Sequence, residues 1–308
     1  MKNLKKIRRI FYKLFKLPLI LIFLKTPLII ILKNRFKKQH FTKKKNFIIS
    51  LLDNLFFKEY FLKISDPVKQ RELTNFSVSD GYGKKWAQIY YDSHFLTLKN
   101  LNSKFVKGNE NMILNAANPI YSEIITFIEK NKIQNDQDYY LIQIGSASGR
   151  DLEFFYKMFP NLKFISTDIN DEIINFQKDK YKIKNFFFFK CYAEELDKCF
   201  SNFELHNKKL ILISIGSLQY VIPHFLQVFF EKLNTLEKFD LFIQEPVDLN
   251  ILDLNNDFKS ESRGKSSFTH NYKLYSKKYN LIKFKIVRPY IHKNVGNCYL
   301  HISKGNNN

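Results

Sequence analysis

The sequence predicts an α/β protein built around a mostly parallel sheet. From residue 137 onward, apolar strand-like runs alternate with helix-like segments at spacings that suit right-handed strand–helix–strand crossovers. A loop of very small residues follows the first run, and an acidic residue ends the second. After the fifth run the alternation stops, and two strand-like segments follow it, which predicts seven strands in all with a reversed pair at the end.

The composition is that of a globular protein long enough to bury a full core. The chain has 308 residues, of which 45% are hydrophobic and 26% are charged, and these values exclude a disordered chain. The net charge of +21 is concentrated in residues 1–45, which contain fifteen Lys or Arg and no Asp or Glu. The other 35 basic residues face 29 acidic ones, so any strong attraction to an anionic partner belongs to residues 1–45.

Residues 1–45 combine a basic amphipathic pattern with an aliphatic run. The 16-residue run 17–32 is interrupted by Pro18, Lys25 and Pro27, so it is a poor transmembrane helix and a poor signal peptide. We expect the basic amphipathic part of this segment to lie as a helix on an anionic membrane surface, with the aliphatic run inserted below the headgroups. A helical arm packed on the domain and a nucleic-acid-binding arm are the alternatives.

Residues 46–135 are predicted to form a helical region, which could cap the substrate. Helical patterns cover Phe47–Leu62, resume near Trp86, and begin again at Pro119, because Pro suits the first turn of a helix over Pro119–Lys130. Residues 1–135 together are therefore expected to be a helical N-terminal extension of the α/β domain.

The alternating elements of the α/β domain, residues 136–308, are assigned in order. The strands are predicted at Tyr139–Ile144, Lys163–Thr167, Phe186–Lys190, Leu210–Ile215 and Asp240–Gln244. The helices between them are predicted at Asp151–Met158, Asp171–Lys180, Glu194–Phe200 and His224–Leu236. The end of the chain is predicted as a helix, two strands and the turn between these strands, at His270–Asn280, Leu281–Tyr290, Asn297–Ser303 and Asn294–Gly296.

The loop after the first strand carries the strongest functional signal. Gly145, Ala147 and Gly149 alternate in it, so that a ligand can approach the backbone closely. Asp168 ends the second strand, 23 positions after Gly145, where a carboxylate can accept hydrogen bonds from both hydroxyls of a ribose. The dinucleotide pattern G-x-G-x-x-G is absent, because Ala147 and Arg150 stand at its second and third glycines.

This loop resembles motif I of the class I S-adenosylmethionine-dependent methyltransferases. The resemblance extends over about residues 137–303 and implies a Rossmann-like fold and S-adenosyl-L-methionine as the cofactor. The sequence departs from the family pattern at Gln143, where an acid is usual, and Asp151 is the nearest acidic residue that could complete the site. The residues to which the resemblance assigns contacts with the cofactor are Gly145, Ser146, Ala147, Gly149, Asp168, Ala193, Glu194 and Ser214.

The resemblance also suggests how the ends of the third and fourth strands are used. Ala193 and Glu194 match the place where the family often fixes the amino group of adenine, although a solvated helix start is an alternative for these residues. The fourth strand leads to Ser217, Gln219 and Tyr220, which are candidates for the boundary between cofactor and substrate. The Asn/Asp-Pro-Pro-Tyr/Phe signature of amino and adenine N-methyltransferases is absent there, which argues against base methylation.

Two residues are candidates for the base that a hydroxyl acceptor would need. Glu245 follows the fifth strand, and His270 follows a polar loop, 248–266, that is predicted to be a substrate lid. Imidazole has a pKa near 6.5, which suits general-base work. Cys191, Cys199 and Cys298 are expected to be reduced, buried thiols in a cytosolic protein, and no metal-ligand spacing is present.

Taken together, the sequence predicts a methyltransferase that O-methylates a sugar or glycan precursor at the cytoplasmic face of a membrane. Two alternatives remain open. One is an RNA methyltransferase whose basic arm grips phosphate, and the other is a nucleoside-binding fold that serves as an interaction module without catalysis.

Overall fold

The computed structural model describes residues 67, 68, 71, 88, 119–251, 259–263, 267–287 and 295–305. The predicted membrane-binding segment 1–45 lies outside the described residues, as does the predicted helical region 46–135 up to residue 118, apart from residues 67, 68, 71 and 88. The same holds for parts of the predicted lid, at 252–258 and 264–266. No helix in the described part of the chain is both long and apolar enough to cross a bilayer.

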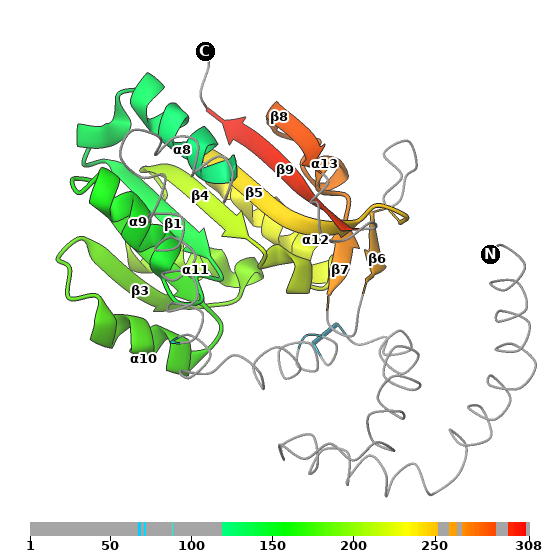
Figure 1. Ribbon diagram of the computed structural model, residues 1–308, viewed down its shortest axis with the longest axis horizontal. Coiled ribbons are helices and arrows are strands. Elements are labelled where there is room, and N and C mark those ends of the chain that lie inside the picture. Colours follow the sequence, from blue (N-terminus) through cyan, green and yellow to red (C-terminus); the bar gives the residue numbers. More distant parts are fainter. Residues whose placement is uncertain are drawn as a thin grey trace, which may run out of the picture. The chain divides into compact units, whose positions relative to one another are not determined.

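Seven strands of the described chain form one sheet in the order β3-β2-β1-β4-β5-β9-β8 (Figure 1). Strands β1 to β5 are parallel, whereas β9 runs antiparallel to both β5 and β8. The predicted seven-stranded, mostly parallel sheet with a reversed C-terminal pair is therefore confirmed. The strands are β1 (Tyr139–Ile144), β2 (Lys163–Asp168), β3 (Phe186–Lys190), β4 (Lys209–Ile215), β5 (Lys238–Asp248), β8 (Asn280–Val287) and β9 (Val295–Lys304).

Helices cover both faces of this sheet (Figure 1). Because strand side chains alternate between faces, Leu141 packs in a cluster with α8 and α9, while Ile142 packs with α11 and α12 on the opposite face. Burial on both faces explains the nearly continuous apolar runs of the central strands. The helices are α8 (Pro119–Lys130), α9 (Arg150–Met158), α10 (Asp171–Lys180), α11 (Leu196–Asn202), α12 (Pro223–Lys232) and α13 (Tyr272–Tyr275).

The starts of these helices follow from local sequence signals. Pro223 stands in the first turn of α12, and the side chain of Asn170 accepts a hydrogen bond from the backbone of Glu172 at the start of α10. The predicted helices Glu194–Phe200 and His224–Leu236 are each divided into an α-helix and a 3₁₀ turn. The first begins with the 3₁₀ turn η3 (Ala193–Glu195) and continues as α11, and the second begins as α12 and continues as the 3₁₀ turn η5 (Leu233–Thr235).

The prediction of a helix over 270–280 is wrong for its first part. His270 ends a short strand, β7 (Phe268–His270), which pairs antiparallel with β6 (Ser260–Ser262). Only the single turn α13 follows before β8 begins at Asn280. Strand pairing fixes the extended backbone of β7, and this tertiary contact overrides the helical pattern of the local sequence. Strand β9 likewise begins at Val295, inside the predicted turn.

Candidate functional site

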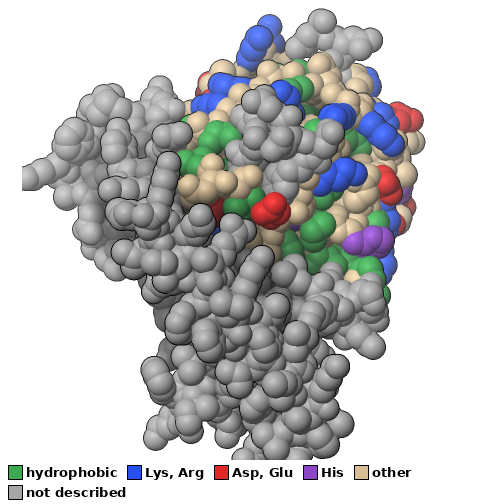
Figure 2. Space-filling view, turned by 90° about the vertical axis from the view of Figure 1, so that its right-hand side faces the viewer, with side chains coloured by type: hydrophobic (Ala, Val, Ile, Leu, Met, Phe, Trp, Pro, Cys, Tyr) green, Lys and Arg blue, Asp and Glu red, His purple; other side chains and the backbone are tan. Residues whose placement is uncertain are grey.

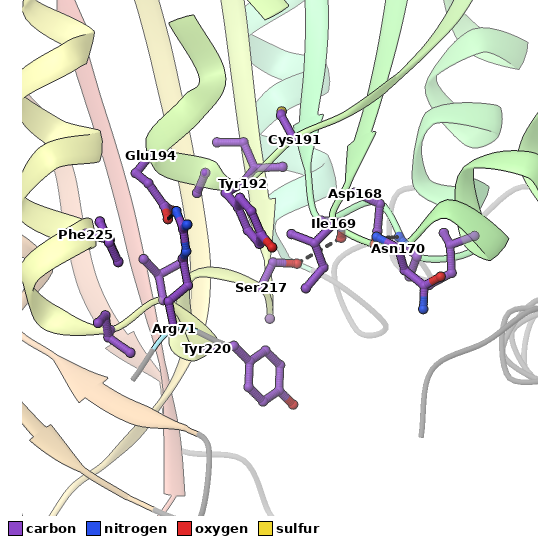
Figure 3. Close-up of a pocket in the computed structure, with 18 of the residues that line it drawn as sticks. Arg71, Asp168, Ile169, Asn170, Cys191, Tyr192, Glu194, Ser217, Tyr220 and Phe225 are labelled. Carbon is purple, nitrogen blue, oxygen red and sulfur yellow. Dashed lines mark hydrogen bonds and ion pairs between the residues drawn. The ribbon is translucent and has the colours of Figure 1, made fainter. Parts of the chain in front are cut away.

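The candidate site is a cavity of about 350 Å³ at the carboxyl ends of the parallel strands (Figure 3). Ligands of open α/β sheets bind at this edge, where the chain leaves each strand for its helix. The loops after β1, β2, β3 and β4 each contribute to the walls, together with Arg71. The lining residues include Gly145, Ala147, Asp168, Ile169, Tyr192, Ala193, Glu194, Gly216, Ser217, Tyr220 and Phe225.

The loop after β1 needs its small residues for two physical reasons. Gly145 and Gly149 have left-handed φ angles of 66° and 74°, which favour glycine. A Cβ atom at Gly145 would lie 2.4 Å from Oγ of Ser217, so the loop packs directly on the chain that leaves β4. Ala147 also has a positive φ, of 52°, and both Gly145 and Ala147 line the cavity.

Ser146 and Gly149 support this loop and are not among the residues that line the cavity. The Ser146 hydroxyl lies 2.5 Å from the Ser166 hydroxyl and accepts a hydrogen bond from Nε2 of Gln177 at 2.9 Å. The same Gln177 amide donates to the carbonyl of Ala147 at 2.6 Å. Gly149 is the N-cap of α9, where an added Cβ would meet the Tyr181 ring at 2.8 Å.

Asp168 brings a carboxylate to the cavity from the end of β2. Its Oδ2 accepts a hydrogen bond from the backbone of Ala147 at 3.1 Å, and its Oδ1 accepts one from the backbone of Asn170 at 3.0 Å. The following helix, α10, is capped by Asn170. Burial raises the pKa of the Asp168 carboxyl to about 6, although the backbone N–H groups favour the charged form.

The chain after β3 places an acid and an aromatic ring at another wall. Ala193 and Glu194 belong to η3, and both line the cavity together with Tyr192. Oε1 of Glu194 receives a hydrogen bond from Nη1 of Arg71 at 3.0 Å. The Arg71 guanidinium lies 4.4 Å from the centre of the Tyr192 ring and 4.8 Å from that of Phe225 (Figure 3).

Glu245 is fully buried beneath the turn that follows β4, and it is not a lining residue. Its Oε1 accepts hydrogen bonds from the Ser214 hydroxyl at 2.6 Å and from the backbone of Ser217 at 2.9 Å. The backbone of Leu218 and that of Gln219 donate to Oε1 and Oε2 at 3.0 and 3.1 Å. Glu245 and Ser214 therefore support the turn after β4 that forms part of the cavity wall. Desolvation raises the pKa of the Glu245 carboxyl.

His270 is also buried away from the cavity lining. Its Nδ1 lies 2.7 Å from the Ser260 hydroxyl, and its ring stacks on Phe268. Burial lowers the pKa of the imidazole to about 3, so the ring is neutral and only weakly basic at neutral pH. The geometry therefore favours a structural role for His270 and Glu245 over the role of catalytic base.

The Gln143 amide and the Asp151 carboxylate are joined at the face covered by α8 and α9. Nε2 of Gln143 donates to Oδ2 of Asp151 at 2.6 Å, and the Tyr121 hydroxyl bonds the other carboxylate oxygen. Neither Gln143 nor Asp151 lines the cavity, so this network braces the start of α9. Among the described residues, no group of three or more His, Cys, Asp or Glu side chains could hold a metal ion.

Sequence reasoning identified most of the polar groups in the cavity but missed several of its walls. Ser217 and Tyr220 line it as expected, whereas Gln219 is buried behind it. The strand-end rule could have found Ile169 and Gly216, which directly follow β2 and β4. Arg71 lies 123 positions before its partner Glu194, and nothing in the local sequence signals that contact.

The protein combines this strand order with a reversed C-terminal pair and with a cavity at the loop after β1. The fold is that of the class I S-adenosylmethionine-dependent methyltransferases. No protein-family profile matches the sequence, and no curated protein matches it. The assignment of the methyltransferase fold therefore rests on the sheet topology, together with the motif I resemblance of the loop after β1.

Solved structures of similar fold include methyltransferases from three organisms. One is a putative sarcosine dimethylglycine methyltransferase from Galdieria sulphuraria, with 10% identity, a TM-score of 0.46, and coverage of 62% of this chain and 86% of that one. Another is the 1,6-didemethyltoxoflavin-N1-methyltransferase of Burkholderia thailandensis, with bound S-adenosylhomocysteine. Its identity is 13%, its TM-score is 0.43, and the match covers 70% of this chain and 90% of that one. The third is a polyketide-synthase O-methyltransferase of Brevibacillus brevis, also with S-adenosylhomocysteine. Its identity is 8%, its TM-score is 0.40, and the match covers 62% of this chain and 78% of that one.

Proposed function

We propose that this chain is an S-adenosylmethionine-dependent methyltransferase whose cofactor lies in the cavity with its ribose on Asp168. The observation that carries the proposal is the buried Asp168 carboxylate at the cavity wall, held by the backbone N–H groups of Ala147 and Asn170. Each of these bonds uses one lone pair of a different oxygen, so both oxygens can still accept a donor from a ligand. Two adjacent hydroxyls of a ribose fit this arrangement.

The rest of the lining fits the same cofactor. Gly145 and Ala147 leave backbone without bulky side chains beside the cavity, which suits close approach of an amino-acid moiety. Glu194, beside Tyr192 and Phe225, provides a hydrogen-bond acceptor next to flat apolar surfaces, which suits an aminopurine. When bound, S-adenosylmethionine supplies a methyl group activated by its sulfonium. The protein then has to orient an acceptor and exclude water.

For the acceptor we propose a sugar hydroxyl of a glycan precursor at a membrane surface. This proposal is supported by the sequence of residues 1–45, which joins fifteen basic residues to an aliphatic run. On the face drawn in Figure 2, several described Lys and Arg side chains lie among other side chains of the α/β domain.

A hydroxyl acceptor also needs a base, and the described lining offers few. Asp168 is assigned to the ribose and Glu194 is bound to Arg71, while His270 and Glu245 are buried outside the cavity lining. Transfer of the methyl group to the hydroxyl oxygen leaves neutral S-adenosylhomocysteine and releases the hydroxyl proton, which would pass to solvent water or to a base outside the described residues. This requirement makes the nature of the acceptor the first thing to measure.

The test is transfer of a labelled methyl group from S-adenosylmethionine to fractionated cell envelopes of cells that lack the protein. We expect label in a glycan-containing fraction, and mass spectrometry should show an increment of one methylene there. The variant Asp168→Ala should leave the fraction unlabelled. Label in RNA would overturn the glycan proposal, and the absence of any transfer would support an interaction module without catalysis.

A further inference from the structure

We propose that Arg71 and the nucleobase of the cofactor compete for one flat slot, so that the cofactor must displace the Arg71 side chain. The inference rests on the proposed function, because it assigns the base of the same cofactor to the end of the cavity near Glu194. It goes further by assigning to Arg71 an internal, competing contact at that place.

The contacts of Arg71 define the slot. Its guanidinium lies over two aromatic rings, at 4.4 Å from the centre of Tyr192 and 4.8 Å from that of Phe225. One edge of the guanidinium donates a hydrogen bond to Oε1 of Glu194 at 3.0 Å. Figure 3 shows the Arg71 side chain extending between Glu194, Tyr192 and Phe225, and all four residues line the cavity.

The chemistry of this slot suits an aminopurine as well as it suits a guanidinium. Both groups are planar, both present N–H donors along one edge, and both stack on aromatic faces. A slot with aromatic walls and a carboxylate at its end can hold either group, but not both at once. The Glu194 side chain is only 6% exposed, so its carboxylate strongly favours a partner that donates hydrogen bonds.

The Arg71 contact is also incomplete, which suits a group that can be displaced. Its side chain keeps 23% of its surface exposed, and its Nε is a buried donor without a partner among the described residues. A buried donor left without an acceptor opposes the stability of the contact. Arg71 therefore occupies the slot at a moderate free energy, which a well-fitting base can overcome.

The experiment is a calorimetric titration of S-adenosylhomocysteine into the full-length protein and its variants. We expect Arg71→Ala to bind about tenfold more tightly than the wild type, because one ion pair and two cation–π contacts no longer compete with the base. Arg71→Lys keeps the charge but loses the flat, stacked group, and should lie between them. Lys182→Ala removes an exposed charge that lies outside the lining and should bind as the wild type does.

Salt gives a second measurement that does not depend on how well the Arg71→Ala variant folds. Salt weakens the partly exposed Arg71–Glu194 pair, so S-adenosylhomocysteine should bind the wild type more tightly as salt is raised. Equal or weaker binding by Arg71→Ala, with binding by the wild type intact, would overturn the competition and leave the proposed function standing. Failure of every protein to bind would overturn the proposed function and the inference with it.

Discussion

The carboxylate of Asp168 and the backbone amide of Ala147 join the end of β2 to the loop after β1, with 3.1 Å between Oδ2 and the amide nitrogen. The group proposed to hold the ribose and the loop proposed to hold the amino-acid part of the cofactor are thereby parts of one unit. Any change at Asp168 should therefore alter both the charge and the shape of the cavity.

The first prediction concerns the sugar. The wild type should bind S-adenosylhomocysteine at least about tenfold more tightly than its 2′-deoxy analogue, because one hydrogen bond to a charged acceptor is lost. Asp168→Ala should bind both compounds weakly and equally. Calorimetry measures both affinities. If Asp168→Ala discriminates between the two compounds as strongly as the wild type does, the ribose is not bound by Asp168.

The second prediction concerns pH and binding. Because the pKa of Asp168 is raised to about 6, the carboxyl is partly protonated in mildly acidic solution. The hydroxyls of a ribose prefer the charged form, so affinity for S-adenosylhomocysteine should rise between about pH 5 and pH 7 and then level off. Asp168→Asn should show no such rise. A flat profile in the wild type would contradict the assignment.

The same pKa makes a prediction for the protein measured without added ligand. The folded pKa lies above the usual 3.8 of an aspartate, so the folded state binds more protons than the unfolded state between these values. The contribution of Asp168 to stability is thus lost as the pH rises through about 6. We expect the free energy of unfolding of the wild type to fall as the pH rises from about 4 to about 6, relative to that of Asp168→Asn, which lacks the titrating carboxyl. An identical pH dependence of the two proteins in urea unfolding would be inconsistent with this account.

Glu245 should behave as a structural residue. Replacement by Gln should lower the free energy of unfolding by about 2–4 kcal/mol, because the amide has one acceptor oxygen where the buried carboxyl group accepts four hydrogen bonds on two. Ser214→Ala removes only one of these bonds and should cost about 1 kcal/mol. Chemical denaturation measures both. If Glu245→Gln abolished methyl transfer while stability stayed unchanged, Glu245 would be the base.

The two glycines beside the cavity allow a matched comparison. Gly145 and Gly216 both have left-handed φ angles, of 66° and 69°, so either Ala variant meets backbone strain of about 1 kcal/mol. The new Cβ at Gly145 would also lie 2.4 Å from Oγ of Ser217, whereas at Gly216 the nearest atom is 3.6 Å away. Gly145→Ala should therefore lose more stability and more affinity for S-adenosylhomocysteine. Equal losses would show that the close packing of the two loops is unimportant.

The sequence was sufficient where the signals are local. The glycine loop and the acid at the end of β2 follow directly from strand ends, and the structure brings Gly145 and Asp168 to one cavity. The sequence was insufficient where the pairing of strands that are far apart in the chain determines the local structure. Strand β5 continues to Asp248 because it pairs with β9, so Glu245 lies inside a strand and not after one. Pairing of β6 with β7 buries His270 in the same way.

The most direct test of the central claim is a crystal structure of the protein with S-adenosylhomocysteine. We expect both ribose hydroxyls at hydrogen-bond distance, about 2.7 Å, from the oxygens of Asp168. The homocysteine part should lie along Gly145 and Ala147. A ligand bound at another place, or bound in this cavity with its ribose away from Asp168, would contradict the account.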